Sequence, residues 1–177
     1  FLDECFGRAL YAAVPLDTVA FLATGPVGLP SLRVEFSWAG ESAVLYVTHP
    51  LPPTTPRQFA WLKAHLAEIA ARVAAEQAAG RAVILAGDLN TTEASPWFRA
   101  LLAVGRLDDS RRGFGWQASW PAGLTAFLGI PLDHLLVSDD WEVVRREVGP
   151  RIGSDHLPVR ATLRLDRATR DGLSPAT

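Results

Sequence analysis

The sequence has 177 residues, of which 49% are hydrophobic, and it carries a formal net charge of −2 at pH 7. This length and apolar content suffice for one folded domain with a core. The slightly acidic net charge does not favour binding of nucleic acid, which usually requires clustered Lys and Arg. A single cysteine, Cys5, excludes an intrachain disulfide and a cysteine-based metal site.

The first third of the chain predicts three strands. The first spans residues 18–24, and a glycine- and proline-rich loop follows it as far as Pro30. Apolar and polar residues alternate over 31–38, which is typical of a half-buried strand. A tight turn at 39–42 leads into a more apolar strand at 43–48, so we predict a β-hairpin.

A long helix is predicted next. Thr55 is a suitable N-cap, Pro56 suits the first helical position, and Gly80 is a suitable stop. Apolar residues recur at spacings of three and four, which predicts one buried face composed of Phe59, Leu62, Leu66, Ile69 and Val73.

The second half of the chain continues to alternate strands and helices. The apolar run at 82–86 is too short for a helix and predicts a strand that is covered on both faces. A second helix is expected to begin at Ser95-Pro96 and to close at Gly105, before an irregular segment at 106–123. Three further strands are predicted at 132–138, 141–148 and 157–165.

This order of elements favours a layered α/β fold with a mixed sheet. We expect residues 1–165 to form the domain and the polar residues 166–177 to form a disordered tail. The chain contains no methionine, so we expect it to be a piece of a longer protein. No apolar run approaches the roughly 20 residues that a membrane-spanning helix needs.

Polar residues capable of catalysis lie at the ends of predicted strands. Side chains at strand ends can converge in one crevice without entering the core, so we expect them to share a site. Each of them alone also has a structural interpretation, such as a histidine that is hydrogen-bonded within the fold or an Asx turn. They are His49, Asp88 with Asn90, Asp133 with His134, and Asp155 with His156.

Four short motifs resemble, in order and spacing, those of the endonuclease/exonuclease/phosphatase superfamily. They are Thr48-His49, Gly87-Asp88-Leu89-Asn90, Asp133-His134 and Ser154-Asp155-His156-Leu157-Pro158-Val159. The resemblance covers roughly residues 14–165. It implies a four-layer α/β-sandwich of which this chain is the C-terminal portion, with the N-terminal part missing.

The resemblance also implies roles for the acids and the base. His156 would be the general base or a stabiliser of the transition state, and Asp133 would orient its imidazole. A neighbouring carboxylate favours the imidazolium and raises the pKa of such a histidine. Asp88 would orient or activate the attacking water.

Further residues would hold the phosphate and the metal ion. By the same resemblance, Asn90 would donate to a phosphoryl oxygen, His49 to the phosphate or the leaving group, and Asp155 would approach the metal. Mg²⁺ is the expected cofactor, with Mn²⁺ as an alternative, because hard divalent ions suit carboxylates and phosphate. The superfamily's upstream Asn motif and its metal-binding Glu, commonly after Gln, are not found; Glu4 lies in a different context.

The expected function is divalent-metal-dependent hydrolysis of a phosphate ester by the full-length protein, as a phosphodiesterase or phosphatase. The acidic balance and the proline-rich stretch after His49 favour a small or lipid-linked substrate over duplex DNA. Two alternatives stay open: a non-catalytic binding or scaffold domain, which the missing Glu motivates, and a nuclease of the same superfamily.

The segment 48–53 and the Trp120-Pro121 loop resemble a bacterial branch whose members often carry this domain after membrane-spanning helices. Membrane association through segments outside this chain, and an extracytoplasmic location, are therefore expected. The sequence does not indicate an oligomeric state.

Several other residues have a structural interpretation as well as a functional one. His134 should face away from Asp133 on a strand, so we predict a structural role for it. His65 is expected to be a surface or structural residue. Trp116 and Trp120 could contact substrate, and Arg111-Arg112 either meets a phosphate or belongs to a solvated loop.

Overall fold

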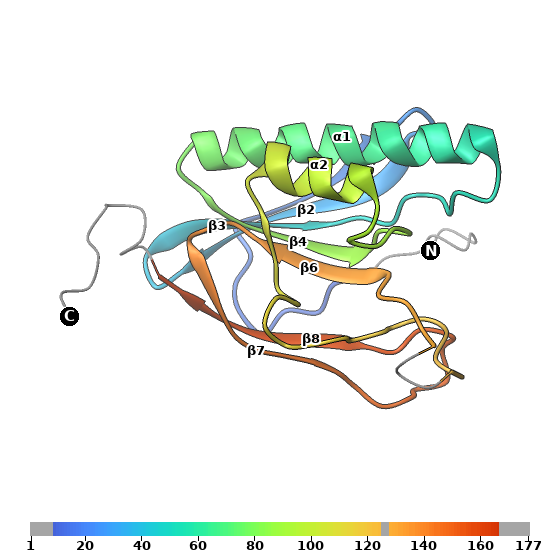
Figure 1. The fold of residues 1–177 in the computed structure, drawn as a ribbon. Coiled ribbons are helices and arrows are strands. Elements are labelled where there is room, and N and C mark those ends of the chain that lie inside the picture. The colour runs from blue at the N-terminus through green and yellow to red at the C-terminus, as the bar shows by residue number, and fades with distance from the viewer. Residues whose placement is uncertain (1–8, 125–127, 167–177) are drawn as a thin grey trace.

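The computed structural model describes residues 9–124 and 128–166. These residues form three layers, in which two helices cover one face of a six-stranded sheet and a two-stranded sheet lies on the other face (Figure 1). The predicted layered α/β fold with a mixed sheet is confirmed, whereas the fourth layer of the expected sandwich stays a prediction. The large sheet contains β1 (Thr18–Thr24), β2 (Leu29–Trp38), β3 (Glu41–Val47), β4 (Ala82–Asp88), β5 (Asp108–Asp109) and β6 (Asp133–Val137).

The order of strands in the large sheet brings the predicted site residues to one edge. The order is β1-β2-β3-β4-β6-β5, with β3 and β4 parallel and β4 and β6 antiparallel. The carboxyl ends of β3 and β4 and the amino end of β6 therefore meet. In the register of β4 and β6, Asp88 lies directly opposite Asp133.

Helix α1 (Pro56–Ala78) forms the crossover between the two parallel strands. Its start is the predicted one, because the Thr55 side chain accepts a hydrogen bond from the backbone N–H of Gln58 at 3.2 Å. Gly80 follows the end of the helix with a φ of +83°, a conformation that favours glycine. The prediction that Phe59 belongs to the buried face was wrong, since it is 44% exposed and packs edge-on against Trp97 of the second helix at 6.2 Å.

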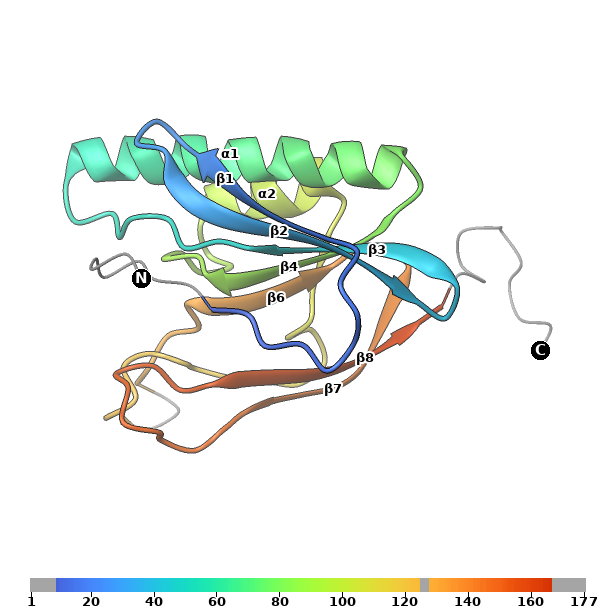
Figure 2. The same ribbon diagram turned by 180° about the vertical axis from the view of Figure 1, so that it is seen from behind.

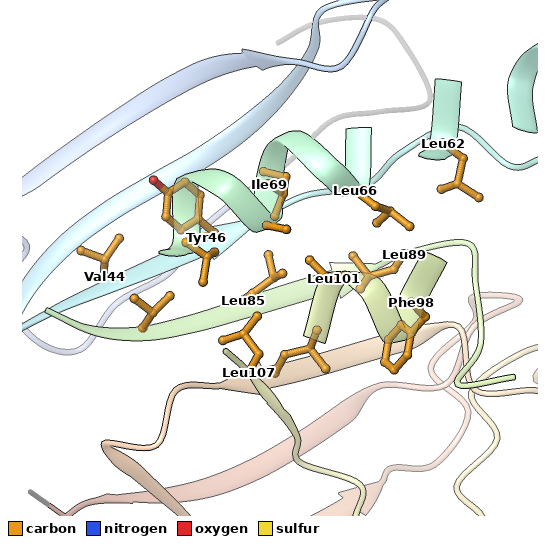
Figure 3. Close-up of a cluster of buried hydrophobic side chains, with 14 residues drawn as sticks. Val44, Tyr46, Leu62, Leu66, Ile69, Leu85, Leu89, Phe98, Leu101 and Leu107 are labelled. Carbon is orange, nitrogen blue, oxygen red and sulfur yellow. The ribbon is translucent and has the colours of Figure 1, made fainter. Parts of the chain in front are cut away.

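The main core lies between the helices and the large sheet (Figure 3). Helix α2 (Pro96–Gly105) begins after Ser95, as predicted, and ends in a left-handed residue, Arg106. Each helix presents an apolar stripe to the sheet, and the aliphatic side chains interdigitate with those of the strands. The core residues labelled in Figure 3 are Val44, Tyr46, Leu62, Leu66, Ile69, Leu85, Leu89, Phe98, Leu101 and Leu107.

The small sheet consists of the antiparallel pair β7 (Trp141–Val148) and β8 (Val159–Leu165). Figure 2 shows the pair on the face of the large sheet that the helices do not cover. A second, smaller cluster joins the two sheets, and its buried members are Ala43, Ala82, Val137 and Trp141.

The boundaries of several predicted elements differ from the observed ones. Pro30 lies inside β2 rather than in the preceding loop. Because it is the second residue of the strand, the N–H that proline lacks removes little hydrogen bonding from the sheet. Strand β8 begins at Val159, because Leu157 bonds through its N–H to Ser119 rather than to the sheet. The two-residue β5 lies in the segment expected to be irregular.

Two further expectations concern the ends of the chain and the membrane. Beyond Asp166, the predicted disordered tail lies outside the described residues, as does Glu4. Among the residues that the structure describes, no helix combines the length and the hydropathy needed to cross a bilayer.

Candidate active site

Four of the predicted site residues come together at the edge where β3, β4 and β6 meet. His156 Nδ1 donates a hydrogen bond to Asp133 Oδ2 at 2.7 Å. Asp88 Oδ2 lies 3.7 Å from His156 Nε2 and 3.4 Å from His49 Nε2. Two carboxylates and two imidazoles thus share one small region, although they come from distant parts of the sequence.

Strand alternation sends Asp133 and His134 in opposite directions, as the sequence predicts. Asp133 faces His156, whereas His134 is buried toward the helices. The Nε2 atom of His134 lies 2.9 Å from the carbonyl oxygen of Thr91, and its ring packs on Phe98 with centroids 4.5 Å apart. Burial lowers the pKa of His134, which fits a structural histidine rather than a catalytic one.

A glycine allows the ends of β3 and β4 to approach closely enough for His49 to reach Asp88. Gly87 has a φ of +146°, and a Cβ atom placed on it would lie 1.9 Å from the carbonyl oxygen of Thr48. Thr48 also donates its backbone N–H to the Ala86 carbonyl at 3.1 Å. The glycine of the Gly-Asp-Leu-Asn motif therefore has a packing function that is separate from any chemistry.

Asn90 supports the site through two contacts. Its backbone N–H donates to Asp88 Oδ1 at 2.8 Å, which fixes the carboxylate in an Asx turn. Its side-chain Nδ2 donates to the Pro50 carbonyl at 2.9 Å and so holds the segment that follows His49. The role of Asn90 as a phosphate donor stays a prediction.

Asp155 is exposed, and its backbone carbonyl accepts a hydrogen bond from the N–H of Ala122 at 2.7 Å. Within residues 9–124 and 128–166, no group of three or more His, Cys, Asp or Glu side chains is arranged to hold a metal ion. The assignment of Asp155 as a metal ligand stays a prediction.

The charges in the cluster shift the protonation of His156 and Asp88. Burial alone would lower the pKa of His156, but the hydrogen bond and charge of Asp133, together with Asp88 and Asp155, raise it above its ordinary value. Burial and the charge of Asp133 raise the pKa of Asp88, against the opposing effects of the Asn90 N–H and the two histidines. The site therefore favours an added positive charge between its carboxylates.

Replacing Asp133 with asparagine is expected to lower the pKa of His156. The substitution removes the carboxylate that stabilises the imidazolium, whereas the burial that opposes protonation remains. NMR titration of the His156 ring would measure the change. Asp139→Asn, at the far end of β6 and 52% exposed, is the matched control and should leave the titration unchanged. A titration that Asp133→Asn also leaves unchanged would contradict the pairing.

The cluster borders a hollow of about 300 Å³ that Ile152, Leu157 and Pro158 help to line. Trp120 lies beside it, with its ring centroid 6.5 Å from that of His156, and it is 37% exposed. A contact between Trp120 and a substrate stays a prediction.

The interpretation of Arg111 as part of a solvated loop was wrong. Its side chain is only 12% exposed, forms an ion pair with Glu93 at 2.8 Å and lies over the ring of Trp116 at 5.6 Å. These partners hold it in place within the fold. Arg112 is exposed, as that interpretation expects, and pairs with Asp108 at 2.6 Å.

Sequence reasoning missed Ser119 and Arg146, two buried residues that bind the backbone of Asp133. Neither belongs to a recognisable motif. Contacts to backbone atoms impose no pattern on the neighbouring sequence, so spacing and periodicity could not have revealed them.

The fold has solved counterparts of low sequence identity. A mannosyl-6-phosphatase from Bacteroides thetaiotaomicron VPI-5482 matches with a TM-score of 0.70 and 16% identity, over 85% of this chain and 67% of that chain. An endonuclease/exonuclease/phosphatase from Beutenbergia cavernae DSM 12333 matches with a TM-score of 0.69 and 21% identity, over 86% and 46%. The human Nocturnin catalytic domain, solved with bound sulfate, matches with a TM-score of 0.66 and 16% identity, over 85% and 60%.

These structural matches show the fold, and the chain spans about half to two thirds of the length of the three proteins. No curated protein sequence matches the chain. The profile of the Endonuclease/Exonuclease/phosphatase family, however, matches residues 6–156, which is most of the sequence. The chain therefore belongs to the Endonuclease/Exonuclease/phosphatase family.

Proposed function

We propose that the full-length protein hydrolyses a phosphate ester with the help of a divalent metal ion. Members of this family are hydrolases that act on phosphate esters. The observation that supports the proposal best is the 2.7 Å hydrogen bond between His156 and Asp133, with Asp88 and His49 beside it. An oriented imidazole next to a second carboxylate is suited to moving a proton during attack by water.

We place the attacking water between Asp88 and His156. The separation of 3.7 Å between Asp88 Oδ2 and His156 Nε2 is too long for a direct hydrogen bond but allows both atoms to bond to one water molecule. Because Asp133 accepts from Nδ1, Nε2 is the nitrogen that exchanges a proton with this water or with the phosphate. His49, when protonated, would donate to a phosphoryl oxygen or to the leaving group.

A divalent ion, Mg²⁺ or Mn²⁺, would neutralise charge on the phosphoryl oxygens when bound. Asp155 is the residue of this chain that we assign to it. A cation in this site would also relieve the repulsion between Asp88 and Asp133, which together with burial raises the pKa of Asp88.

We further propose a small or lipid-linked phosphate ester as the substrate. The net charge of −2 disfavours duplex DNA, and the half-exposed Trp120 beside His156 offers an apolar contact for the ester group. One protein of similar fold is named a mannosyl-6-phosphatase, which supports a small substrate. Membrane attachment and an extracytoplasmic location stay predictions.

The test is hydrolysis of bis(p-nitrophenyl) phosphate and p-nitrophenyl phosphate by the full-length protein, with Mg²⁺, Mn²⁺ or EDTA. Asp88→Asn is expected to lower kcat/KM by about 100-fold or more, the usual size of a general acid–base contribution. Asp139→Asn again serves as the matched control and should retain full activity.

The outcomes separate the candidate functions. Hydrolysis that persists in EDTA, or that Asp88→Asn does not change, would refute the site. Binding of a phosphate ester by the full-length protein without turnover would favour a scaffold domain. Strong preference for duplex DNA over both small esters would favour a nuclease.

A further inference from the structure

Buried side chains bind Asp133 at both ends of its backbone unit. Ser119 Oγ accepts hydrogen bonds from the backbone N–H groups of Leu132 and Asp133, each at 3.1 Å. Arg146 Nη2 donates to the Asp133 carbonyl at 3.2 Å. Ser119 is 1% exposed and Arg146 is 3% exposed, so both contacts are shielded from water.

Ser119 also binds the segment that carries His156. The carbonyl oxygen of Ser119 accepts the N–H of Leu157, the residue after His156, at 2.8 Å. Its own N–H donates to the Ile130 carbonyl at 3.1 Å. One buried residue therefore connects the start of β6 with the loop before β8, and these are the two segments whose side chains form the Asp133–His156 pair.

The position of Asp133 in the sheet explains why such support is needed. The β4–β6 ladder ends at the pair formed by Asp88 and Asp133. Asp133 is therefore the first residue of its strand, and the hydrogen bond from the Leu89 N–H to the Leu132 carbonyl at 2.9 Å lies just before it. A displacement of about 1 Å in a catalytic group can cost on the order of 100-fold in rate.

Arg146, which binds the Asp133 carbonyl, belongs to β7 of the small sheet. Its guanidinium also bonds to Ser110 Oγ at 3.1 Å and to Gln117 Oε1. It thereby links the small sheet to the backbone of Asp133 through the carbonyl, next to the N–H that Ser119 binds.

We propose that Ser119 is a positioning residue that holds Asp133 and the His156 loop in register, and that Arg146 holds the Asp133 carbonyl. The expected loss of catalytic rate rests on the proposed function. The expected weakening of the hydrogen bond between Asp133 and His156 is independent of the proposed function.

The first experiment observes that hydrogen bond directly. Isolated neutral histidine favours the Nε2–H tautomer, whereas a carboxylate that accepts from Nδ1 holds the Nδ1–H tautomer. The ring ¹⁵N chemical shifts of His156, recorded in the full-length protein at a pH where the imidazole is neutral and assigned with His156→Gln, report the tautomer. We expect Nδ1–H in the wild type and a shift toward Nε2–H in Ser119→Ala.

A matched control lies at the opposite end of β6. Ser138 is fully buried, and its Oγ accepts the backbone N–H of Val83 at 2.9 Å and donates to Asp140 at 2.8 Å. Ser138→Ala should lower the melting temperature to a similar extent and leave the His156 tautomer unchanged. Ser119→Cys, which keeps the volume but offers a weaker acceptor, gives a milder variant if Ser119→Ala does not fold.

The second experiment is a kinetic double-mutant cycle on the full-length protein with bis(p-nitrophenyl) phosphate. Ser119→Ala is expected to lower kcat about tenfold with little change in KM, because orientation rather than binding is lost. In an Asp133→Ala background, the same substitution should cause no further loss, because Ser119 acts through Asp133.

The outcomes distinguish this inference from the proposed function. If the tautomer is unchanged in both Ser119 variants while the melting temperature falls, Ser119 has only a structural role and the inference is wrong. Additive losses of kcat in the cycle would also overturn it. A tautomer shift in a protein that shows no turnover would support the positioning role and reject the enzymatic one.

Discussion

Replacing Gly87 with alanine is expected to destabilise the protein by about 2–6 kcal/mol, the sum of a strained backbone and a displaced neighbour. Its φ of +146° lies in a region that side chains with a Cβ rarely adopt, and the new methyl group would lie 1.9 Å from the Thr48 carbonyl oxygen. Since both atoms belong to backbone-constrained groups, the ends of β3 and β4 must separate. Asp88 would then move away from His49, and we expect activity to fall together with stability.

Urea denaturation of Gly87→Ala, compared with Gly40→Ala, would measure this effect. Gly40 in the β2–β3 turn also has a positive φ, +83°, but a Cβ there would meet nothing within 4 Å. It therefore isolates the backbone strain, for which about 1–2 kcal/mol is expected. Equal losses in the two variants would show that the contact with Thr48 relaxes at no cost.

Glu76→Ala is expected to cost about 3–5 kcal/mol, the usual effect of removing one partner from a buried ionic network. Glu76 in α1 is 6% exposed. Its carboxylate accepts hydrogen bonds from Arg33 Nε at 2.7 Å, from the Tyr46 hydroxyl at 3.0 Å and from Arg81. Without the carboxylate, the guanidinium of Arg33 and the hydroxyl of Tyr46 would stay largely buried with fewer partners.

The matched control for this variant is Glu68→Ala on the same helix. The Glu68 side chain is 37% exposed, pairs with Arg72 one turn later at 2.6 Å and accepts the Gly25 N–H at 2.8 Å, so a loss of about 2 kcal/mol or less is expected. Chemical denaturation of both variants at neutral pH would provide the comparison. A loss for Glu76→Ala that is no larger than that for Glu68→Ala would contradict the role of the network.

The same network is expected to make the free energy of unfolding decrease at acidic pH. Burial works against the ionised form of Glu76, but hydrogen bonds from Arg33, Arg81 and Tyr46 outweigh it and lower its pKa below the ordinary 4.5. The stabilisation is therefore fully present above about pH 4.5 and is lost as the pH falls through the lowered value. In Glu76→Gln this part of the acid dependence should be absent.

Local sequence patterns predicted much of the fold and the candidate site. Thr55 with Pro56 marked the start of α1, Ser95 marked the start of α2, and the apolar run at 82–86 became a strand covered on both faces. Each of these features depends on residues that are neighbours in sequence, through capping or periodicity. Motif spacing also identified Asp133 and His156, which the fold brings into contact.

Tertiary contacts account for the failures. The apolar period includes Phe59, but α1 begins beyond the region where the sheet covers it, so this ring packs on Trp97 instead. Glu93 and Trp116 hold Arg111, and nothing in the local sequence indicates that pairing. The contacts of Ser119 with β6 are likewise invisible in a linear pattern.

The two sheets divide the candidate chemistry between them. His156 precedes a strand of the small sheet, whereas Asp88 and Asp133 belong to the large one. The apolar cluster that joins these sheets is smaller than the main core, and Trp141 is its largest buried member. A small separation of the two sheets at this cluster would move His156 away from Asp88 and Asp133, while the core between the helices and the large sheet stayed intact.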